Sequence, residues 1–213
     1  GTDYPQEQKR ENQEIHRRGR GRDGMNPLAE NLPIAIRLGG EIYPIRSDWR
    51  SCMKIILAFE DAELTEAEKL SVMTKLLYKK TPPPCGETFE KAIRFLNCGE
   101  NDGDGGESTA AGRLYSFERD GRFIYPAFRQ SHGIDLGTAR LHWWEFCWLF
   151  LDLREDCAFC RLVGLRERKR RGTLSREERE QMAGMERLLE LPQSYSPEER
   201  TRLESFMESM KQS

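Results

Sequence analysis

An aromatic and apolar run, residues 141–150, constrains the fold of this chain more than any other segment. It reads LHWWEFCWLF and holds three of the four tryptophans. At the helical period, apolar residues occupy two sides of this segment: Leu141, Trp144, Trp148 and Leu151 on one, and Trp143, Cys147 and Phe150 on the other. A helix that is apolar over most of its circumference is usually buried on several sides. The run therefore predicts a central helix, capped by Thr138 and ending near Leu153, with other helices packed around it.

The same run allows a core helix, an anchor for a partner protein, or the edge of an active site. His142 and Glu145 lie at i and i+3, so both side chains could reach one point, as two metal ligands must. No third ligand is close in the sequence. We expect His142 and Glu145 to form the polar edge of a core helix, and Trp143 to be the tryptophan that could contact a partner.

The residues before this run predict a β-hairpin and several amphipathic helices. Apolar residues alternate from Ile34 to Leu38, Gly39-Gly40 supplies a tight turn, and residues 42–45 return as a second strand. Pro44 cannot donate to a strand ladder, so the second strand should lie at an edge. We expect helices to begin at Ser47 or Asp48, at the capping box Thr65 to Glu68, and at Ser116. A further short helix should contain Phe89 to Leu96. Gly133 should end the Ser116 helix, and Pro126 should kink it or limit its first half.

Two more helices are expected at the C-terminus, beginning at Ser175 and Ser196. Methionines and other apolar residues share one side of each: Met182, Met185 and Leu189 on the first, and Leu203, Phe206, Met207 and Met210 on the second. A Met-rich side usually packs in a core, but it also suits adaptable binding. We expect packing or self-association here. The candidate partner contacts are Met182, Met185, Phe206, Met207 and Met210.

These patterns divide the chain into parts. Residues 1–24 have almost no apolar side chains and should form a disordered basic extension, placed upstream of a natural start at Met25. Residues 25–165 should form the hairpin and the helical domain, with a flexible loop at 99–112 whose spacing does not fit a calcium-binding EF-hand. A basic linker is expected at 166–174, followed by a C-terminal helical pair at 175–213. The predicted fold class is mostly α, with a small N-terminal hairpin.

Charge and cysteine content limit the functional classes. Lys and Arg number 34 and Asp and Glu 36, so the net charge of -2 gives no general attraction to nucleic acid or membranes. The longest apolar stretch, residues 146–151, is too short to span a bilayer. The six cysteines indicate reduced thiols in a cytoplasmic protein, and the pair Cys157 and Cys160, lacking a second pair, should be structural.

Several short motifs are spread over about Met25 to Pro192. They are Leu32-Pro33, Gly40, Tyr43-Pro44-Ile45, Asp48-Trp49-Arg50, Tyr115-Ser116-Phe117-Glu118, Tyr125, Ala127-Phe128, Gly133-Ile134-Asp135-Leu136, Leu141-His142-Trp143-Trp144, Phe146 and Gly164-Leu165-Arg166. Together these motifs resemble a family of phage and prophage proteins known as the bacteriophage gene-product-fifteen family. Gly121, Pro126 and the Cys157/Cys160 pair depart from the family pattern. The departures argue against a regular helix after Ser116 and against a metal site common to the family.

The resemblance implies a tail assembly chaperone of long-tailed phages, because genes of this family typically lie between those of the major tail protein and the tape measure protein. It implies tape measure and tail tube proteins as partners. Because the sequence has no Gly-rich phosphate loop, nucleophile elbow or carboxylate dyad at a useful spacing, we expect a non-enzymatic protein without a cofactor, located in the host cytoplasm. Two alternatives remain. One is a phage protein that binds nucleic acid through Arg17–Arg22 and Arg166–Arg171. The other is a metal-dependent enzyme around His142 and Glu145.

Overall fold

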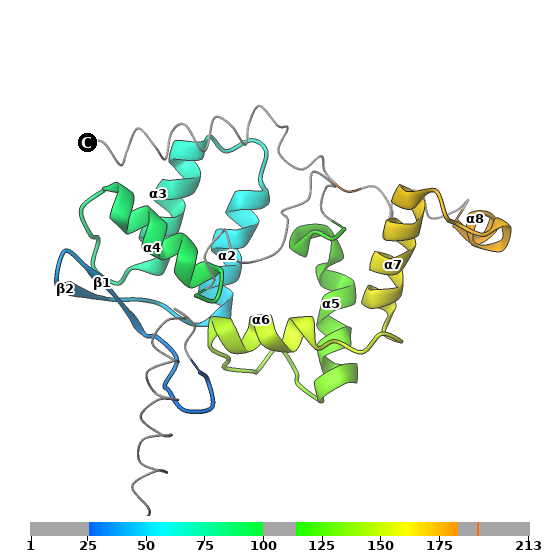
Figure 1. The fold of residues 1–213 in the computed structure, drawn as a ribbon, viewed down its shortest axis with the longest axis horizontal. Helices are drawn as coiled ribbons and strands as arrows, with labels where there is room; N and C mark the ends of the chain where they lie inside the picture. The colour runs from blue at the N-terminus through cyan, green and yellow to red at the C-terminus, as the bar shows by residue number, and fades with distance from the viewer. Residues whose placement is uncertain (1–25, 100–113, 183–190, 192–213) are drawn as a thin grey trace, which may run out of the picture.

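Seven helices and one β-hairpin make up the part of the chain described by the computed structural model, residues 26–99, 114–182 and 191 (Figure 1). In chain order they are β1 (Ala35–Leu38), β2 (Glu41–Pro44), α2 (Trp49–Glu60), α3 (Glu66–Leu77), α4 (Gly86–Leu96), α5 (Phe117–His132), α6 (Trp143–Leu151), α7 (Ala158–Arg171) and α8 (Arg176–Met182). The predicted fold class is confirmed. Within the described ranges, every helix is too short or too polar to traverse a lipid bilayer.

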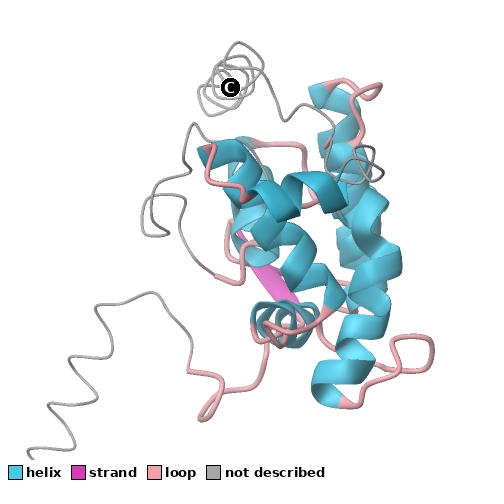
Figure 2. Cartoon of the chain, turned by 90° about the vertical axis from the view of Figure 1, so that its right-hand side faces the viewer, coloured by secondary structure: helices cyan, strands magenta, loops and turns pink. Residues whose placement is uncertain are grey.

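Helix α6 is the central helix of the fold. It extends from the region below α2 and α4 to the side of α5, so that α2, α3 and α4 lie toward one end of α6 and α5 and α7 toward the other (Figures 1 and 2). The Phe146 ring stacks on Trp49 of α2 at 5.1 Å and on Phe128 of α5 at 4.9 Å, between ring centroids. Further along, Phe150 lies 5.4 Å from Phe159 of α7. One apolar face of α6 thus joins both groups into a single core, as the aromatic run predicted.

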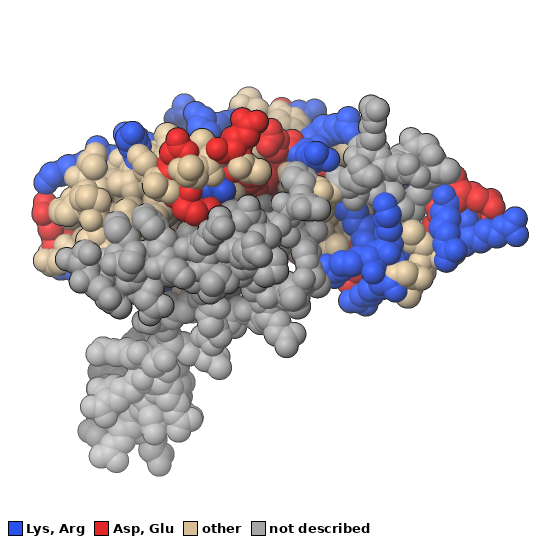
Figure 3. Space-filling model, turned by 90° about the horizontal axis from the view of Figure 1, so that it is seen from above, with Lys and Arg blue, Asp and Glu red and all other residues tan. Residues whose placement is uncertain are grey.

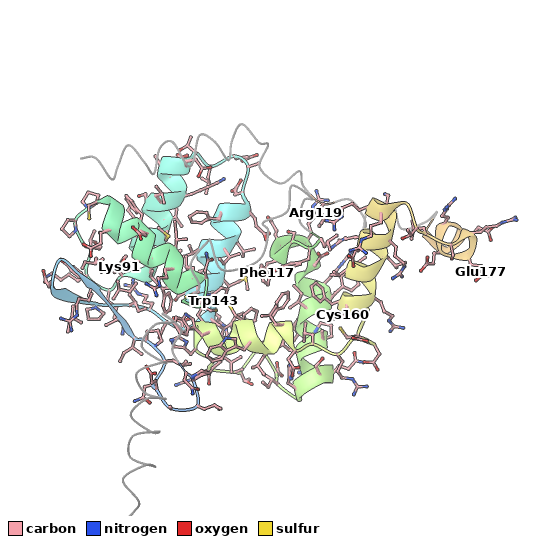
Figure 4. The ribbon with its side chains drawn as sticks, in the orientation of Figure 1. Lys91, Phe117, Arg119, Trp143, Cys160 and Glu177 are labelled. Carbon is pink, nitrogen blue, oxygen red and sulfur yellow. The ribbon has the colours of Figure 1, made fainter. Side chains whose placement is uncertain are left out.

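The hairpin has the predicted strands and turn. Ile36 pairs with Tyr43 and Leu38 with Glu41, and Gly39 and Gly40 have φ of 52° and 87°, which glycine adopts without strain. Ile36, Leu38 and Tyr43 are buried on the face that packs toward the helices. Helix α4 covers the free edge of β1, where Lys91 Nζ donates to the Arg37 carbonyl at 2.7 Å (Figure 4). That contact protects an edge which could otherwise pair with another chain.

Local capping signals set most helix ends. Asp48 caps α2 by accepting from the Ser51 backbone N–H, and Thr65 and Glu68 form the predicted capping box of α3. Ser116 caps α5, and Gly133, with φ of 70°, ends it. Glu60, at the end of α2, adds a contact that the sequence did not reveal. Its carboxylate accepts from the Ser116 hydroxyl at 2.8 Å and from the Phe117 N–H at 3.2 Å, so α2 helps to cap α5.

Pro126 does not end α5 early, which was one of the two outcomes expected there. The helix is assigned without a break from Phe117 to His132. Ile124, Ala127 and Phe128, on both sides of the proline, are buried in the core. Their packing outweighs the single intrahelical hydrogen bond that proline removes.

The prediction of a basic linker at 166–174 is wrong for its first six residues. Helix α7 continues to Arg171 and ends at Gly172, which has φ of 69°. The error has a physical cause, since Arg166 is buried and therefore belongs to the core side of α7. Its guanidinium bonds both carboxylate oxygens of Asp120, at 2.5 and 2.8 Å. The sequence showed only a charged run after Leu165, because the partner is on another helix.

Several predictions fall on residues outside the described part. These are the extension at 1–24, nearly all of the loop at 99–112, the last predicted helix, and the candidates Met185, Phe206, Met207 and Met210. Met182 is the last residue of α8, and its side chain is likewise not described. The start of α8 is as predicted, because Ser175 and Glu178 exchange hydrogen bonds between side chain and backbone.

Candidate functional site

Two of the motifs that carried the family resemblance, Asp48-Trp49-Arg50 and Leu141-His142-Trp143-Trp144, meet where α2 and α6 begin. Asp48 and His142 form an antiparallel bridge. Around it, the Trp143 N–H donates to the Ser47 carbonyl at 2.7 Å, and the Trp49 N–H donates to the Leu141 carbonyl at 3.1 Å. Two segments far apart in the sequence are thereby fixed side by side. We call this region the α2–α6 junction, and it is the best-defined polar site of the described chain.

His142, rather than Thr138, caps α6. Its Nδ1 accepts from the Trp144 backbone N–H at 3.1 Å, while Glu145 Oε2 accepts from the His142 N–H at 2.7 Å. This is a reciprocal pair of cap bonds, with histidine in a position usually held by Ser, Thr, Asp or Asn. The polar edge that was predicted for the helix is therefore its N-terminal cap. Thr138 instead lies in a turn in which its N–H donates to the Asp135 carbonyl at 3.1 Å.

The hydrogen bonds also fix the tautomer of His142. Nε2 lies 3.0 Å from the Pro33 carbonyl oxygen, which can only accept, so Nε2 carries the hydrogen. The Nδ1 lone pair is already used by the Trp144 N–H. Neither nitrogen then has a free lone pair to offer a metal ion in this arrangement. Among the described residues, no group of three or more His, Cys, Asp and Glu side chains could hold a metal.

Trp143 and Trp144 close the junction against α4. Trp143 is 3% exposed and its Nε1 donates to the Leu96 carbonyl at 2.8 Å, while Trp144 Nε1 donates to the Phe95 carbonyl at 2.7 Å. These carbonyls belong to the last turn of α4, where the helix no longer continues; the Phe95 carbonyl also accepts from the Cys98 N–H at 3.1 Å. The structure therefore buries Trp143, the tryptophan named as a candidate partner contact, because α4 covers the side of α6 on which it lies (Figure 4). Its indole N–H is used inside the core.

Arg50 holds the loop between α5 and α6 in place. Its guanidinium donates to the Ala139 and Gly137 carbonyls, each at 2.9 Å, and also to the Leu136 carbonyl. It also lies over the Trp49 ring, 4.6 Å from the centroid. The Asp-Trp-Arg motif thus serves to bind backbone rather than a ligand. This role of Arg50 was not predicted, since nothing in the neighbouring sequence indicates which carbonyls an exposed arginine reaches.

Asp135 organises the same loop from the other side. Its carboxylate accepts from the Tyr125 hydroxyl at 2.6 Å, from the Gly137 N–H at 2.8 Å, and from the Arg129 guanidinium. These donors, the Tyr125 hydroxyl first, lower the pKa of Asp135. A Cβ at Gly137 would lie 2.6 Å from the Tyr125 hydroxyl oxygen, so a larger residue there would have to displace this hydroxyl from its place. The Gly-Ile-Asp-Leu block therefore encodes a loop conformation.

A family model described as Bacteriophage Gp15 protein matches residues 28–191 of this chain. The chain belongs to this family. The match extends from the residues before the hairpin to just beyond α8, so it includes every motif of the α2–α6 junction. No curated protein and no solved structure matches the chain.

The CxxC pair of this Gp15 family member caps a helix. Cys157 is the N-cap of α7, fully buried, and its Sγ accepts from the Cys160 backbone N–H at 3.4 Å. Burial and the hydrogen bond with Cys157 raise the pKa of the Cys160 thiol to about 11. A thiol with so high a pKa is mostly protonated at neutral pH and is a weak nucleophile. The predicted structural role agrees with this arrangement.

Thiol reactivity should follow this burial. At neutral pH we expect iodoacetamide to modify exposed Cys85 well before Cys52 and Cys160, because burial raises the pKa of both of these thiols. Peptide mass spectrometry over a time course would measure the order. Rapid modification of Cys160 in the folded protein would contradict the structure, and modification of all three in urea would serve as the unfolded control.

The basic run of this Gp15 protein is only partly available to a ligand. Lys and Arg side chains gather over α7 and α8, with acidic side chains of α8 beside them (Figure 3). Arg168 pairs with Glu178 at 2.8 Å, and Arg171 pairs with Glu167 at 2.6 Å. The remaining charges lie in the last turn of α7, where cations favour the negative end of the helix dipole. The ion pairs and the position at the end of α7 explain the basic run at 166–171 without requiring that it binds nucleic acid.

Replacing His142 tests its role as a cap. We expect His142→Ala to lower the free energy of unfolding by about 0.5–2 kcal/mol, since it removes the acceptor for the Trp144 N–H. His142→Asn should recover part of this loss, because Asn is a good N-cap residue. Urea unfolding followed by circular dichroism measures both. If Zn²⁺ raised the unfolding midpoint of the wild type but not of His142→Ala, the ring would be a metal ligand after all.

Proposed function

We propose that this Gp15 family protein is a non-enzymatic tail assembly chaperone, which acts in the host cytoplasm by reversible binding to tape measure or tail tube proteins. The observation that carries the proposal is the family match over residues 28–191, together with the tail assembly role that the resemblance implies. A tape measure protein is a long helical chain with apolar stripes. Until the tube polymerises around it, those stripes must be covered.

The arrangement of the α2–α6 junction supports this proposal. His142, Glu145 and Arg50 bond backbone groups, and Asp135 bonds the Gly137 backbone and the side chains of Tyr125 and Arg129, so the most distinctive motif of the chain serves the fold. Binding of a partner would then depend on other residues, at the surface. Large apolar side chains are exposed at several places: Leu28, Ile34, Ile42, Tyr125 and Leu151. Exposed apolar side chains suit reversible protein binding when they gather on one face.

Co-expression with the neighbouring tape measure protein tests the function. We expect that protein to be soluble and to co-purify with the present chain, and to aggregate when expressed alone. Deleting the gene from the phage should leave heads without tails, visible by electron microscopy. If the tape measure protein stays soluble and virions assemble normally without this chain, the proposal is wrong.

An unrelated soluble protein expressed from the same promoter is the control for a general effect on yield. A destabilised variant of this chain, such as one carrying Arg166→Ala, controls for the need for a folded domain. Co-purification of the tail tube protein in place of the tape measure protein would support assembly chaperoning and assign the partner.

A further inference from the structure

The outer face of the hairpin is apolar at its centre and positively charged at two corners. The register places Ile42 opposite Arg37 and Pro44 opposite Ala35, and paired residues of antiparallel strands point to the same side. The opposite side, with Ile36, Leu38 and Tyr43, is the one buried against the helices. Ile42 is 57% exposed, and Pro44 and Arg37 are exposed too. This face is therefore turned to solvent.

A third segment widens the face. Ile45 and Tyr78 form an antiparallel bridge, and the Lys79 N–H donates to the Pro44 carbonyl at 2.9 Å. Continuing that pairing puts Lys79 opposite Pro44, on the same outer side. Neither Arg37 nor Lys79 makes a side-chain hydrogen bond or ion pair with any residue in 26–99 or 114–182. We call Ala35, Arg37, Ile42, Pro44 and Lys79 the outer hairpin face.

No acidic residue belongs to this face by its register. Glu41, the one acid of the two strands, pairs with Leu38 on the inner side and binds Lys80 at 2.9 Å. The outer hairpin face thus offers apolar contact flanked by two cations that no described side chain neutralises. Exposed apolar residues on a sheet face can be covered by a second layer, and a packed helix is one such layer.

We propose that the outer hairpin face docks an amphipathic helix of a partner protein whose apolar stripe is bordered by acidic residues. The apolar side of that helix covers Ile42 and Pro44, and its acidic borders meet Arg37 and Lys79. Charge complementarity selects the partner and sets its orientation, while the apolar contact supplies most of the affinity. The identity of the partner as the tape measure protein rests on the proposed function, but the chemistry of the face does not.

The test uses two synthetic helical peptides of roughly 20 residues, long enough to form helix on binding. They share one Leu and Ile stripe and carry either Glu or Lys at every bordering position. Fluorescence anisotropy with labelled peptide gives the affinities. We expect the wild-type protein to bind the Glu peptide about 10-fold more tightly than the Lys peptide.

Variants assign the binding to the face. Ile42→Ser should weaken binding of the Glu peptide about 10-fold, and the double variant Arg37→Glu with Lys79→Glu should reverse the preference between the two peptides. Leu151→Ser is the matched control, because Leu151 is 80% exposed but lies at the end of α6. It should leave both affinities unchanged. All of the replaced side chains are exposed, and circular dichroism checks that each variant is folded.

Equal wild-type affinity for the two peptides, or full binding by folded Ile42→Ser, would overturn the docking proposal. Co-expression of the same variants with the tape measure protein separates this proposal from the function. If the wild type and Ile42→Ser both keep that protein soluble, the chaperone function stands and the outer hairpin face is not the surface that binds the tape measure protein. If the wild type stabilises neither the tape measure protein nor the tail tube protein, the function is wrong, and the preference between the two peptides still tests the face.

Discussion

Replacing Arg166 by alanine should destabilise the protein by about 3–5 kcal/mol, because it leaves Asp120 as an unpaired buried charge. The side chains of Arg166 and Asp120 are 4% and 2% exposed. Arg166 also donates to the Leu114 carbonyl at 3.1 Å, so α5, α7 and the segment before α5 all depend on it. Urea unfolding followed by circular dichroism would measure the loss.

Two further variants separate charge burial from packing. Arg168→Ala, two residues on, removes a half-exposed arginine from a surface ion pair and should change the stability by less than about 1 kcal/mol. Replacing both buried partners, Arg166→Met with Asp120→Leu, should restore most of the stability lost in Arg166→Ala, since no lone charge is left in the core. If the single and double variants were equally destabilised, packing rather than charge would explain the loss.

Trp143→Ala should cost about 3–5 kcal/mol, as expected for a large aromatic side chain removed from a core. The Trp143 ring stacks on Phe146 at 5.6 Å, and Phe146 is the residue through which α6 joins α2 and α5. The substitution therefore leaves a cavity at the point where both helix groups meet. The midpoint of urea unfolding should fall while far-ultraviolet circular dichroism before the transition remains helical.

Trp143→Phe is the matched variant, since it keeps a ring but removes the indole N–H. It should cost about 1–3 kcal/mol, because the Leu96 carbonyl then loses its buried donor. Leu151→Ala, on the exposed end of the same helix, should lie within about 0.5 kcal/mol of the wild type. A Trp143→Ala protein as stable as the wild type would restore Trp143 as a candidate surface residue.

The features predicted correctly from the sequence are those decided by a few neighbouring residues. Asp48, the Thr65 to Glu68 box, Ser116 and Gly133 act on backbone groups within one helical turn, so the local pattern identifies them. The hairpin belongs to the same class, because its glycine turn fixes the register of both strands. The apolar period likewise identified α6 as central.

The errors share a different cause, namely contacts between residues far apart in the chain. The start of α6 at Trp143 rather than Thr138 depends on Asp135 and Arg50, which keep the preceding residues in a turn. The burial of Trp143 depends on α4, and the extension of α7 depends on Asp120. A local signal for the His142 cap was present, because Glu145 lies at the third helical position, as in a capping box. Histidine is uncommon as an N-cap, however, and the two residues were considered as metal ligands instead.

The position of α6 has a consequence for how the chain folds during synthesis. Residues 26–99, with the hairpin and α2 to α4, leave the ribosome before α6 has been translated. At roughly 5–20 residues per second, several seconds pass before Phe146 and Trp143 can cover Trp49 and the end of α4. In that interval the nascent chain exposes aromatic surface that only its own later residues can bury. We therefore expect the nascent chain of this proposed chaperone to need chaperones of the host. Ribosome-stalled chains that end before α6 should bind them.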